Sequence, residues 1–233
     1  MKDHTEGRCE NCIIRQLNSL KALDKETLKK ISDSKITKTI KKGEALFEEG
    51  EKLNGVFCVR SGVSKLSKMS ENGKDQIVKI ASKGEVLGQR SVITEEITNL
   101  SAIALNDMEV CYIQKQHLTE NISNNAAFTK AVLLQMANDL KFADDTIVNM
   151  SLKTVKQRLA ETILYLDKTF DTDADGYIDL ILSREDIANI VGTAKEACIR
   201  TLAEFKSKGW ILLNGKRILI KDKNALRQLS KGL

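Results

Sequence analysis

Glycines punctuate residues 36–114 at short, nearly even intervals, and this spacing restricts the fold more than any other feature of the sequence. Gly43, Gly50, Gly62, Gly73 and Gly84 fall seven to twelve residues apart. The 233-residue chain contains no Pro, so glycine must form most of the turns, with help from Asn and Asp. Such intervals fit short strands, but they leave no room for the helix of a β-α-β unit. The spacing predicts an antiparallel jelly roll.

Short apolar runs at residues 56–59, 63–69 and 76–81 lie between these glycines and are the expected strands. Before the roll, we expect a short helix from about Asp24 to Ile31, with Asp24 as its N-cap. Leu28 and Ile31 would lie on one face of that helix.

The period of the apolar residues changes after residue 122. Between residues 123 and 150 they recur at alternating steps of three and four, which is a heptad pattern over nearly three heptads. Lys141, Asp144 and Asp145 border this narrow strip. The strip favours a helix that pairs in parallel with its own copy over a helix that packs inside one chain. The predicted interface consists of Leu133, Met136, Leu140, Ala143, Ile147 and Met150.

The sequence from residue 151 to 233 predicts a second domain. A helix to about Phe170 and an Asp-rich loop lead to an expected strand at residues 177–182. Ser183 and Asp186 have the spacing of a capping box at the start of the next helix. That helix runs to Gly192, which allows a tight turn.

A further helix, TAKEACIRTLAEFKSKG, follows with Thr193 as its expected cap. Two apolar strands come next, and Asn214-Gly215 is the expected hairpin turn between them. Helix, turn, helix and hairpin together describe a winged helix-turn-helix.

The second of these helices carries polar residues near its N-terminal half, opposite an apolar face, as a helix that reads the major groove requires. Arg200 can pair with guanine, and Glu196, four residues earlier, can accept from cytosine. An ordinary Glu–Arg surface pair is the alternative. The predicted DNA-contacting residues are Thr193, Lys195, Glu196, Ile199, Arg200, Lys216 and Arg217.

The distribution of charge supports this assignment. The net charge is +5, from 37 Lys and Arg against 32 Asp and Glu. Residues 183–233 hold 11 basic and 5 acidic side chains, a balance of +6, which leaves −1 for the rest of the chain. A basic C-terminal segment indicates a polyanionic partner, either nucleic acid or a membrane surface.

These features together resemble the Crp/Fnr family of bacterial transcription regulators. The likeness spans nearly the whole chain, and LSREDIANIVGTAKEACIRTLAEFKSKGWI follows the family's helix-turn-helix signature. The Glu-x-x-x-Arg of the family's recognition helix falls on Glu196 and Arg200. Ile199 departs from the Ser or Gly often found before the Arg. The resemblance implies a cyclic-nucleotide-binding-like roll, a dimerisation helix and a palindromic DNA site.

Members of the family that bind cyclic AMP carry a Gly-Glu pair and later an Arg-Ser or Arg-Thr pair. This chain has Gly88-Gln89 and Leu100-Ser101 at these places, and Arg90 stands at a different spacing. Without the carboxylate and the guanidinium, nothing complements the ribose hydroxyl and the cyclic phosphate. The resemblance therefore implies an effector pocket at these five residues that does not bind cyclic AMP.

A branch of the family similar to the oxygen sensor Fnr holds a [4Fe–4S] cluster on cysteines. Cys9 and Cys12 match two of that branch's N-terminal ligands, Cys111 matches the distant one, and Asn18 replaces the remaining Cys. The resemblance implies a cluster with three firm ligands. A redox dithiol, half of a zinc site and unmodified thiols remain alternatives. Cys58 and Cys198 lie in apolar patterns and are interpreted as core residues.

Two further classes of site, a calcium loop and a catalytic centre, have partial or no support in the sequence. Residues 171–179 match an EF-hand loop through its ninth position, but Leu182 replaces the bidentate Glu, so we expect a polar turn. His4 and His117 are the only histidines, and no set of nucleophile, base and orienting residue is present, so we expect no enzyme.

The sequence therefore predicts an α+β protein with an antiparallel β-roll (jelly-roll) sensor domain, a long dimerisation helix and a winged helix-turn-helix domain. The predicted boundaries are 1–122, 123–150 and 151–233. We expect a homodimer that binds double-stranded DNA and RNA polymerase. With no apolar leader or spanning segment, we expect it in the cytoplasm and not at a membrane. The alternative is a redox-sensing, iron–sulfur-sensing or ligand-binding module that acts through a protein partner.

Overall fold

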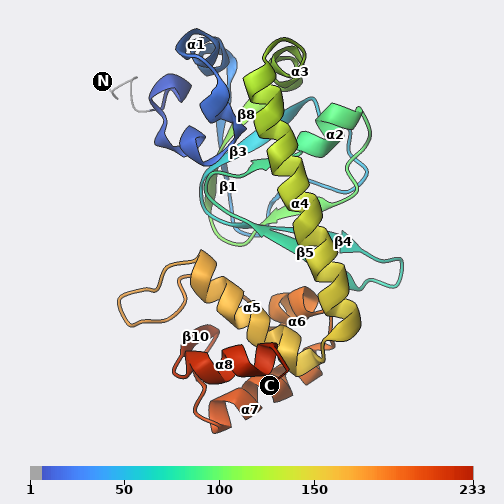
Figure 1. The fold of residues 1–233 in the computed structure, drawn as a ribbon, viewed down its shortest axis with the longest axis vertical. Helices are drawn as coiled ribbons and strands as arrows, with labels where there is room; N and C mark the ends of the chain where they lie inside the picture. The colour runs from blue at the N-terminus through green and yellow to red at the C-terminus, as the bar shows by residue number, and fades with distance from the viewer. Residues whose placement is uncertain (1–6, 233) are drawn as a thin grey trace. The chain divides into compact units, whose positions relative to one another are not determined.

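The computed structural model describes residues 7–232, so the polar stretch at residues 1–6 lies outside it. The described chain divides into two compact units (Figure 1). Unit 1 comprises residues 7–68 and 78–141, and unit 2 comprises residues 69–77 and 142–232. In the described part of the chain, no helix is both long and apolar enough to cross a membrane.

Unit 1 is built on two four-stranded antiparallel sheets, which confirms the predicted roll. The first sheet has the order β1-β8-β3-β6, and the second has the order β2-β7-β4-β5. The strands are β1 (Ile36–Ile40), β2 (Ala45–Phe47), β3 (Gly55–Ser61), β4 (Ser64–Met69), β5 (Asp75–Ala81), β6 (Val86–Leu87), β7 (Ser101–Ala104) and β8 (Met108–Gln114).

Strand alternation gives the first sheet two different apolar faces. Phe57 and Val59 of β3 face the interior of the roll, where they pack with Phe47 and Val110. Val56 and Cys58, which alternate with them along β3, belong to a second apolar cluster on the outer face of the sheet. We call this second group the outer-face cluster. Its buried members are Cys9, Ile14, Leu20, Leu23, Leu28, Ile31, Val56, Cys58, Val92, Cys111, Ile113, Leu118, Phe128 and Val132.

The N-terminal segment covers the outer-face cluster. It consists of three short 3-10 helices, η1 (Cys9–Asn11), η2 (Ile13–Leu17) and η3 (Ser19–Ala22), followed by α1 (Lys25–Ser34). The expected cap of α1 is confirmed, because an Asp24 carboxylate oxygen accepts a 2.7 Å hydrogen bond from the Thr27 amide. Leu28 and Ile31 of α1 are almost fully buried. The sequence did not indicate η1, η2 or η3.

Three helices follow within or after the roll: α2 (Gln89–Thr94), α3 (Lys115–Asn124) and α4 (Ala126–Leu152). The 27-residue α4 is the long helix that the heptad pattern predicted. Its first turns carry Phe128 and Val132 into the outer-face cluster.

Unit 2 contains α5 (Val155–Thr169), α6 (Arg184–Val191), α7 (Lys195–Ser207), the hairpin β9 (Ile211–Asn214) and β10 (Arg217–Ile220), and α8 (Lys223–Ser230). The predicted capping box is present, with the Ser183 hydroxyl accepting from the Asp186 amide at 2.9 Å. The buried core of this unit includes Leu159, Ile163, Ile187, Leu202, Phe205, Ile211 and Leu226.

Three local predictions in unit 2 were wrong. Residues 177–182 form no strand, because only an isolated bridge joins Thr172 and Ile178. Thr193 does not cap α7, since the N-cap is Ala194 and no side chain bonds there. The hairpin turns at Gly215 and Lys216 and not at Asn214-Gly215, because Asn214 is already paired with Arg217.

Candidate DNA-binding surface and sensor site

The helix-turn-helix consists of α6, a turn at residues 192–194, and α7. Gly192 ends α6 with φ of 67°, a left-handed conformation that costs glycine little. A Cβ at this position would also lie 2.9 Å from the Met150 sulfur. The turn therefore favours glycine for its backbone conformation, and a side chain there would also displace the end of Met150.

One arginine outside the predicted contact set, Arg158, holds this turn by hydrogen bonds to its backbone. Arg158 of α5 donates from Nε to the Val191 carbonyl at 2.7 Å and from Nη2 to the Gly192 carbonyl at 3.2 Å. Its Nη1 donates to the Lys153 carbonyl at 2.6 Å. Arg158 thus satisfies carbonyl groups at the ends of two helices and ties α5 to the helix-turn-helix.

The two faces of α7 differ as the sequence predicted. Cys198, Leu202 and Phe205 are at most 1% exposed and pack into the core of unit 2. Ile199 on the other side is 45% exposed. The predicted contact residues Lys195, Glu196 and Arg200 are exposed as well, while Thr193 is half-buried in the turn. An outward polar face on a helix held by its apolar side can enter a groove of DNA without unfolding.

The two predicted basic residues of the wing differ in exposure. Lys216 lies exposed in the turn between β9 and β10. Arg217 is half-buried, and its Nη2 contacts carboxylate oxygens of Asp173 at 2.5 Å and Asp175 at 2.8 Å. Its guanidinium also stacks 4.2 Å from the centre of the Tyr177 ring. Arg217 therefore joins the wing to the Asp-rich loop instead of extending free into solvent.

Hydrogen bonds from the loop itself and from Arg217 organise the Asp-rich loop. Asp173 Oδ1 accepts from the amides of Asp175 and Tyr177, each at 3.0 Å, and Oδ2 accepts from Arg217. Burial opposes the ionisation of Asp173, but these hydrogen bonds outweigh it and lower the pKa of the carboxyl. The loop is a polar turn, as expected.

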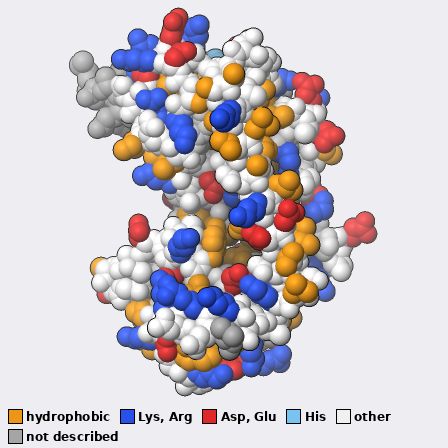
Figure 2. Space-filling model, in the orientation of Figure 1, with side chains coloured by type: hydrophobic (Ala, Val, Ile, Leu, Met, Phe, Trp, Pro, Cys, Tyr) orange, Lys and Arg blue, Asp and Glu red, His pale blue; other side chains and the backbone are white. Residues whose placement is uncertain are grey.

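Basic side chains gather over the part of unit 2 that carries α7 and α8 (Figure 2). Most of the +6 excess of residues 183–233 lies on exposed positions, including Lys195, Arg200, Lys216 and Arg227. Such a surface attracts a polyanion over a distance of about one Debye length, roughly 8–10 Å at physiological salt.

The residues predicted for an effector pocket lie at the start of α2, beside it, and at or next to β7. Gln89 is buried, and its Nε2 has no hydrogen-bond partner. Arg90 is bonded to Asn99 at 2.6 Å, and the Ser101 hydroxyl accepts from the Glu49 amide at 2.9 Å. Gly88 caps α2, and Leu100 is half-buried before β7.

Aromatic and aliphatic side chains fill the interior of the roll. The Phe57 ring lies 5.9 Å from Phe47 and 5.2 Å from Tyr112, measured between ring centres. These contacts place apolar groups where a charged ligand would need polar partners.

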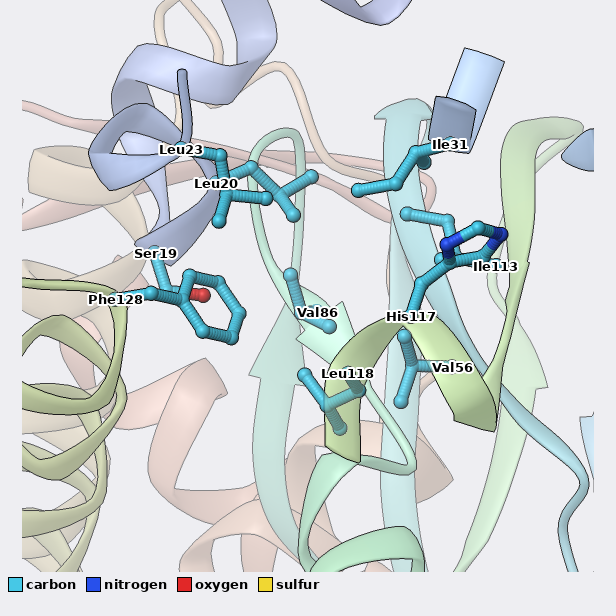
Figure 3. A pocket seen from close by; sticks show the side chains of 10 residues that line it. All are labelled: Ser19, Leu20, Leu23, Ile31, Val56, Val86, Ile113, His117, Leu118 and Phe128. Atoms are coloured by element: carbon cyan, nitrogen blue, oxygen red, sulfur yellow. The ribbon is translucent and has the colours of Figure 1, made fainter. Parts of the chain in front are cut away.

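A separate pocket in unit 1 lies between the N-terminal segment, the first sheet and the starts of α3 and α4 (Figure 3). Its walls are mostly aliphatic, with Phe128 on one side. The ring of His117 lines it as well, and its Nε2 lies 2.6 Å from the Ser34 hydroxyl. The lining residues are Ser19, Leu20, Leu23, Ile31, Val56, Val86, Ile113, His117, Leu118 and Phe128. Such a lining suits an apolar group.

The three cysteines that the sequence marked as metal ligands converge on the outer-face cluster. Cys9 and Cys111 are buried members of it, and the half-buried Cys12 packs against it. Burial raises the pKa of Cys9, although Lys35 nearby acts in the opposite direction. Within residues 7–232, no group of three or more His, Cys, Asp or Glu side chains could hold a metal ion in this arrangement. Thiols are the donors that an iron–sulfur cluster takes, so the donor chemistry fits such a cluster.

The predicted dimer seam on α4 divides into two rows. Leu133, Leu140 and Ile147, each seven residues apart, are 64%, 64% and 67% exposed. Of the second row, Met136 packs partly against the outer-face cluster, and Met150 is half-buried in unit 2. Ala143 is exposed between them. The first row is therefore an apolar stripe with no cover, and Figure 2 shows hydrophobic side chains along α4.

Two family models match the chain in the places where the roll and the helix-turn-helix lie. The model of the cyclic nucleotide-binding domain matches residues 37–125. The model of the Crp-like helix-turn-helix domain matches residues 157–229.

Similar proteins of known role cover almost the whole chain. It is 30% identical over 227 residues to the anaerobic regulatory protein of Haemophilus influenzae, which covers 95% of this chain and 87% of that protein. It is 27% identical over 237 residues to the transcriptional activator protein Anr of Pseudomonas protegens, with 100% and 96% covered.

Among solved structures, FixK2 from Bradyrhizobium japonicum has the same fold, with a TM-score of 0.76 at 23% identity over 84% of this chain and 96% of that one. Two matched domains in the expected order, relatives that span the full length and a shared fold agree with one another. The chain therefore belongs to the Crp/Fnr family of transcription regulators and carries the family's DNA-binding helix-turn-helix.

Proposed function

We propose that this regulator binds a palindromic DNA site as a homodimer, with α7 of each copy in the major groove. The observation that carries the proposal is the amphipathic arrangement of α7. Its apolar face is locked into the core of unit 2, while Glu196 and Arg200 project from the exposed face. Family members are transcription regulators and not enzymes.

The exposed residues of unit 2 divide into base readers and phosphate contacts. Arg200 has the forked donor geometry for guanine O6 and N7, and Glu196 can accept from cytosine N4. Ile199 between them offers an apolar contact to a thymine methyl group. Lys195 at the start of α7 and Lys216 at the tip of the wing suit phosphates.

Thr193 and Arg217 complete the proposed contact set in a supporting role. The Thr193 hydroxyl, in the turn before α7, can donate to a phosphate. Arg217 fixes the wing through Asp173 and Asp175, so that Lys216 is held toward the backbone of the DNA.

The proposed dimer forms through the exposed row of α4. Leu133, Leu140 and Ile147 lie on one side of the helix, and burying large side chains of this kind contributes roughly 1.5–3 kcal/mol each. A parallel pair of such helices has a two-fold axis, which matches a palindromic DNA site.

We propose that the sensor responds to a signal other than cyclic AMP. The guanidinium and carboxylate that complement a cyclic nucleotide are missing, and the roll interior is apolar. The cysteines on the outer-face cluster support an iron–sulfur cluster, which supplies sensitivity to oxygen and redox state when bound. We place the regulator in the cytoplasm, where thiols stay reduced.

A relative named as a transcriptional activator supports RNA polymerase as a second partner. The alternative proposal, a redox or ligand-binding module that acts through a protein partner, predicts no preference among DNA sequences.

Titrations of the full chain with a palindromic duplex of the family's type and with a scrambled duplex separate the two proposals. We expect the palindrome to bind at least a hundredfold more tightly and the affinity to fall steeply with added salt. Equal affinity for both duplexes, or no dependence on salt, would reject DNA binding as the function.

A further inference from the structure

A fourth cysteine, Cys58, lies among the three that the sequence marked. It stands on β3 with its side chain on the outer face of the first sheet, since Phe57 and Val59 face the roll interior. In the β3–β8 pair, Cys58 is directly opposite Cys111. Directly opposed residues have Cβ atoms about 4.5–5.5 Å apart. The two buried thiols are therefore neighbours on one face.

The N-terminal segment brings the other two cysteines to the same place. Cys9 is 6% exposed and belongs to the same apolar cluster as Cys58 and Cys111. Cys12, between η1 and η2, packs against that cluster. Each of these three cysteines acts electrostatically on the Cys58 thiol, Cys111 most strongly. Four of the five cysteines in the chain thus gather in one region of unit 1.

Asn18 stands where the Fnr-like spacing has its third N-terminal cysteine, so this chain lacks one of the expected thiol ligands. It stands six residues after Cys12, the position of the missing third cysteine in the C-x-x-C-x-x-x-x-x-C spacing. Its Nδ2 lies 3.5 Å from the Cys58 sulfur and donates to the Gly84 carbonyl at 2.9 Å. The Asn18 amide therefore occupies the expected ligand position and contacts the sulfur of Cys58 on β3.

The segment can approach the sheet this closely because residue 84 is glycine. A Cβ on Gly84 would lie 2.5 Å from the Leu17 Cβ. Asn18 follows directly, caps η3 through its Oδ1 and is 7% exposed. The position of Asn18 beside Cys58 is thus fixed by packing and by three polar contacts.

We propose that Cys58 is the fourth thiolate ligand of a [4Fe–4S] cluster whose other ligands are Cys9, Cys12 and Cys111. The inference rests on the sensor role proposed above and names the ligand that the sequence pattern lacked. On binding, each thiol loses its proton to solvent as its sulfur bonds to iron, and no electron is transferred to the protein.

An iron–sulfur cluster fits this arrangement better than a single ion. No three of these side chains could hold one metal ion as they stand, whereas a four-iron core is wider and takes ligands that lie farther apart. Cys9 begins the short 3-10 helix η1, and Cys12 lies in extended backbone between η1 and η2. The weaker hydrogen bonds of 3-10 helices allow local adjustment. Lys35, close to Cys9, supplies a positive charge beside the bound thiolates.

The first test reconstitutes the full chain without oxygen from ferrous and ferric salts and sulfide. We expect about four iron and four sulfide per chain and a broad visible absorption band. Cys58→Ser should lose most of the iron and the band. Cys198→Ser, which removes a buried thiol from unit 2, is the matched control and should keep both. A Cys58→Ser protein with full iron, or a wild-type chain that takes up zinc and no iron, overturns the proposal.

A second measurement needs no variant and so does not depend on whether Cys58→Ser folds. Mössbauer spectra of wild-type protein loaded with iron-57 distinguish four thiolate-bound irons from three plus one with an oxygen or nitrogen ligand. We expect four equivalent cysteine-ligated sites. A distinct fourth iron would overturn the assignment.

A rescue variant tests whether residues 18 and 58 can supply the fourth thiolate to the same place. Asn18→Cys combined with Cys58→Ser returns the fourth thiolate from the neighbouring residue, and we expect the iron content of the wild type. A double variant with wild-type circular dichroism but no cluster counts against the proposed geometry.

Binding of the palindromic duplex is measured on the same samples. A cluster-loaded chain without sequence preference would reject DNA binding and leave the ligand assignment standing. Sequence-specific binding by a chain that never takes up iron would support DNA binding and reject the ligand assignment.

Discussion

The Nε of Arg158 lies 2.7 Å from the carbonyl oxygen of Val191, the last residue of α6. The same guanidinium reaches the Gly192 and Lys153 carbonyls. One side chain on α5 therefore fixes the turn that sets the angle between α6 and α7.

Replacing Arg158 with Ala should destabilise unit 2 and weaken DNA binding together. Hydrogen bonds from a charged donor contribute about 1.5–3 kcal/mol each, and the carbonyl groups of Met150, Lys153, Val191 and Gly192 would lose this donor. We expect a fall of at least about 2 kcal/mol in the free energy of unfolding, measured by urea denaturation. Lys168→Ala, at an exposed position on the same helix, is the control and should change stability by less than about 0.5 kcal/mol. Equal effects of the two substitutions would refute this role.

Arg200→Ala should relax sequence discrimination and leave the fold intact, because the side chain is exposed. Loss of a bidentate pair with guanine costs about 1–3 kcal/mol, or roughly ten- to hundredfold in affinity at that base pair. Competition binding with duplexes mutated one base pair at a time measures the change. Lys206→Ala, near the end of the same helix, should lower affinity for all duplexes alike. Full discrimination by the Arg200 variant would remove the assigned contact.

Leu140→Glu should convert the proposed dimer to a monomer. The side chain is 64% exposed in one chain, so the fold tolerates a carboxylate there, but a paired helix would bury two of them face to face. Sedimentation velocity gives the molecular mass. Val148→Glu places the same charge on an exposed position outside the heptad row and should stay dimeric. A dimeric Leu140 variant would show that the copies meet elsewhere.

The wing loop should loosen in acid. The hydrogen bonds to Asp173 lower its pKa below the ordinary value of 3.8, against the effect of burial. A lowered pKa in the folded state gives stability that is complete above the unfolded pKa and is lost as pH falls through the folded pKa. We therefore expect wild type to exceed Asp173→Asn in urea midpoint by a constant margin above about pH 5, and the margin to shrink below about pH 4. A margin that does not change with pH would contradict the ion pair with Arg217.

Thiol reactivity of the iron-free chain should follow burial. Burial raises the pKa of Cys58 to about 12 and that of Cys198 to about 11, so both remain protonated thiols at pH 8. We expect iodoacetamide to modify the half-buried Cys12 first and these two last, as followed by mass spectrometry of peptides. In urea all five cysteines should react alike. Early modification of Cys58 in the folded chain would mean that the N-terminal segment does not cover it.

Local patterns predicted the roll, the long helix and the helix-turn-helix because each depends on residues close together in sequence. Glycine spacing defines the turns of the roll, and Ser183 with Asp186 marks the start of α6. The predicted strand at residues 177–182 was wrong because local hydrogen bonds, which the apolar pattern does not show, fold the preceding loop. Asp173 bonds two amides of its own loop, and the chain turns there instead of extending into a strand.

Contacts between distant residues could not be predicted from one sequence. In the sequence, Arg158 is one of several polar residues on an amphipathic helix. Only the fold shows that α6 ends beside it. The sequence indicated that Cys58 is an ordinary core residue. Both faces of β3 are apolar, so the sequence does not show on which face Cys58 lies. Its contact with Asn18 joins residues 40 positions apart.

The helix α4 would take part in both of the proposed equilibria, dimerisation and binding of the cluster. Phe128 and Val132 near its start help to enclose the cysteines, and Leu140 and Ile147 farther along form the exposed row. Because coupling between two binding events on one element is reciprocal, pairing of the helices that steadies its first turns would also strengthen retention of the cluster. Under this linkage, protein concentration becomes part of the signal: a dilute regulator would lose its iron at a lower oxygen exposure than a concentrated one.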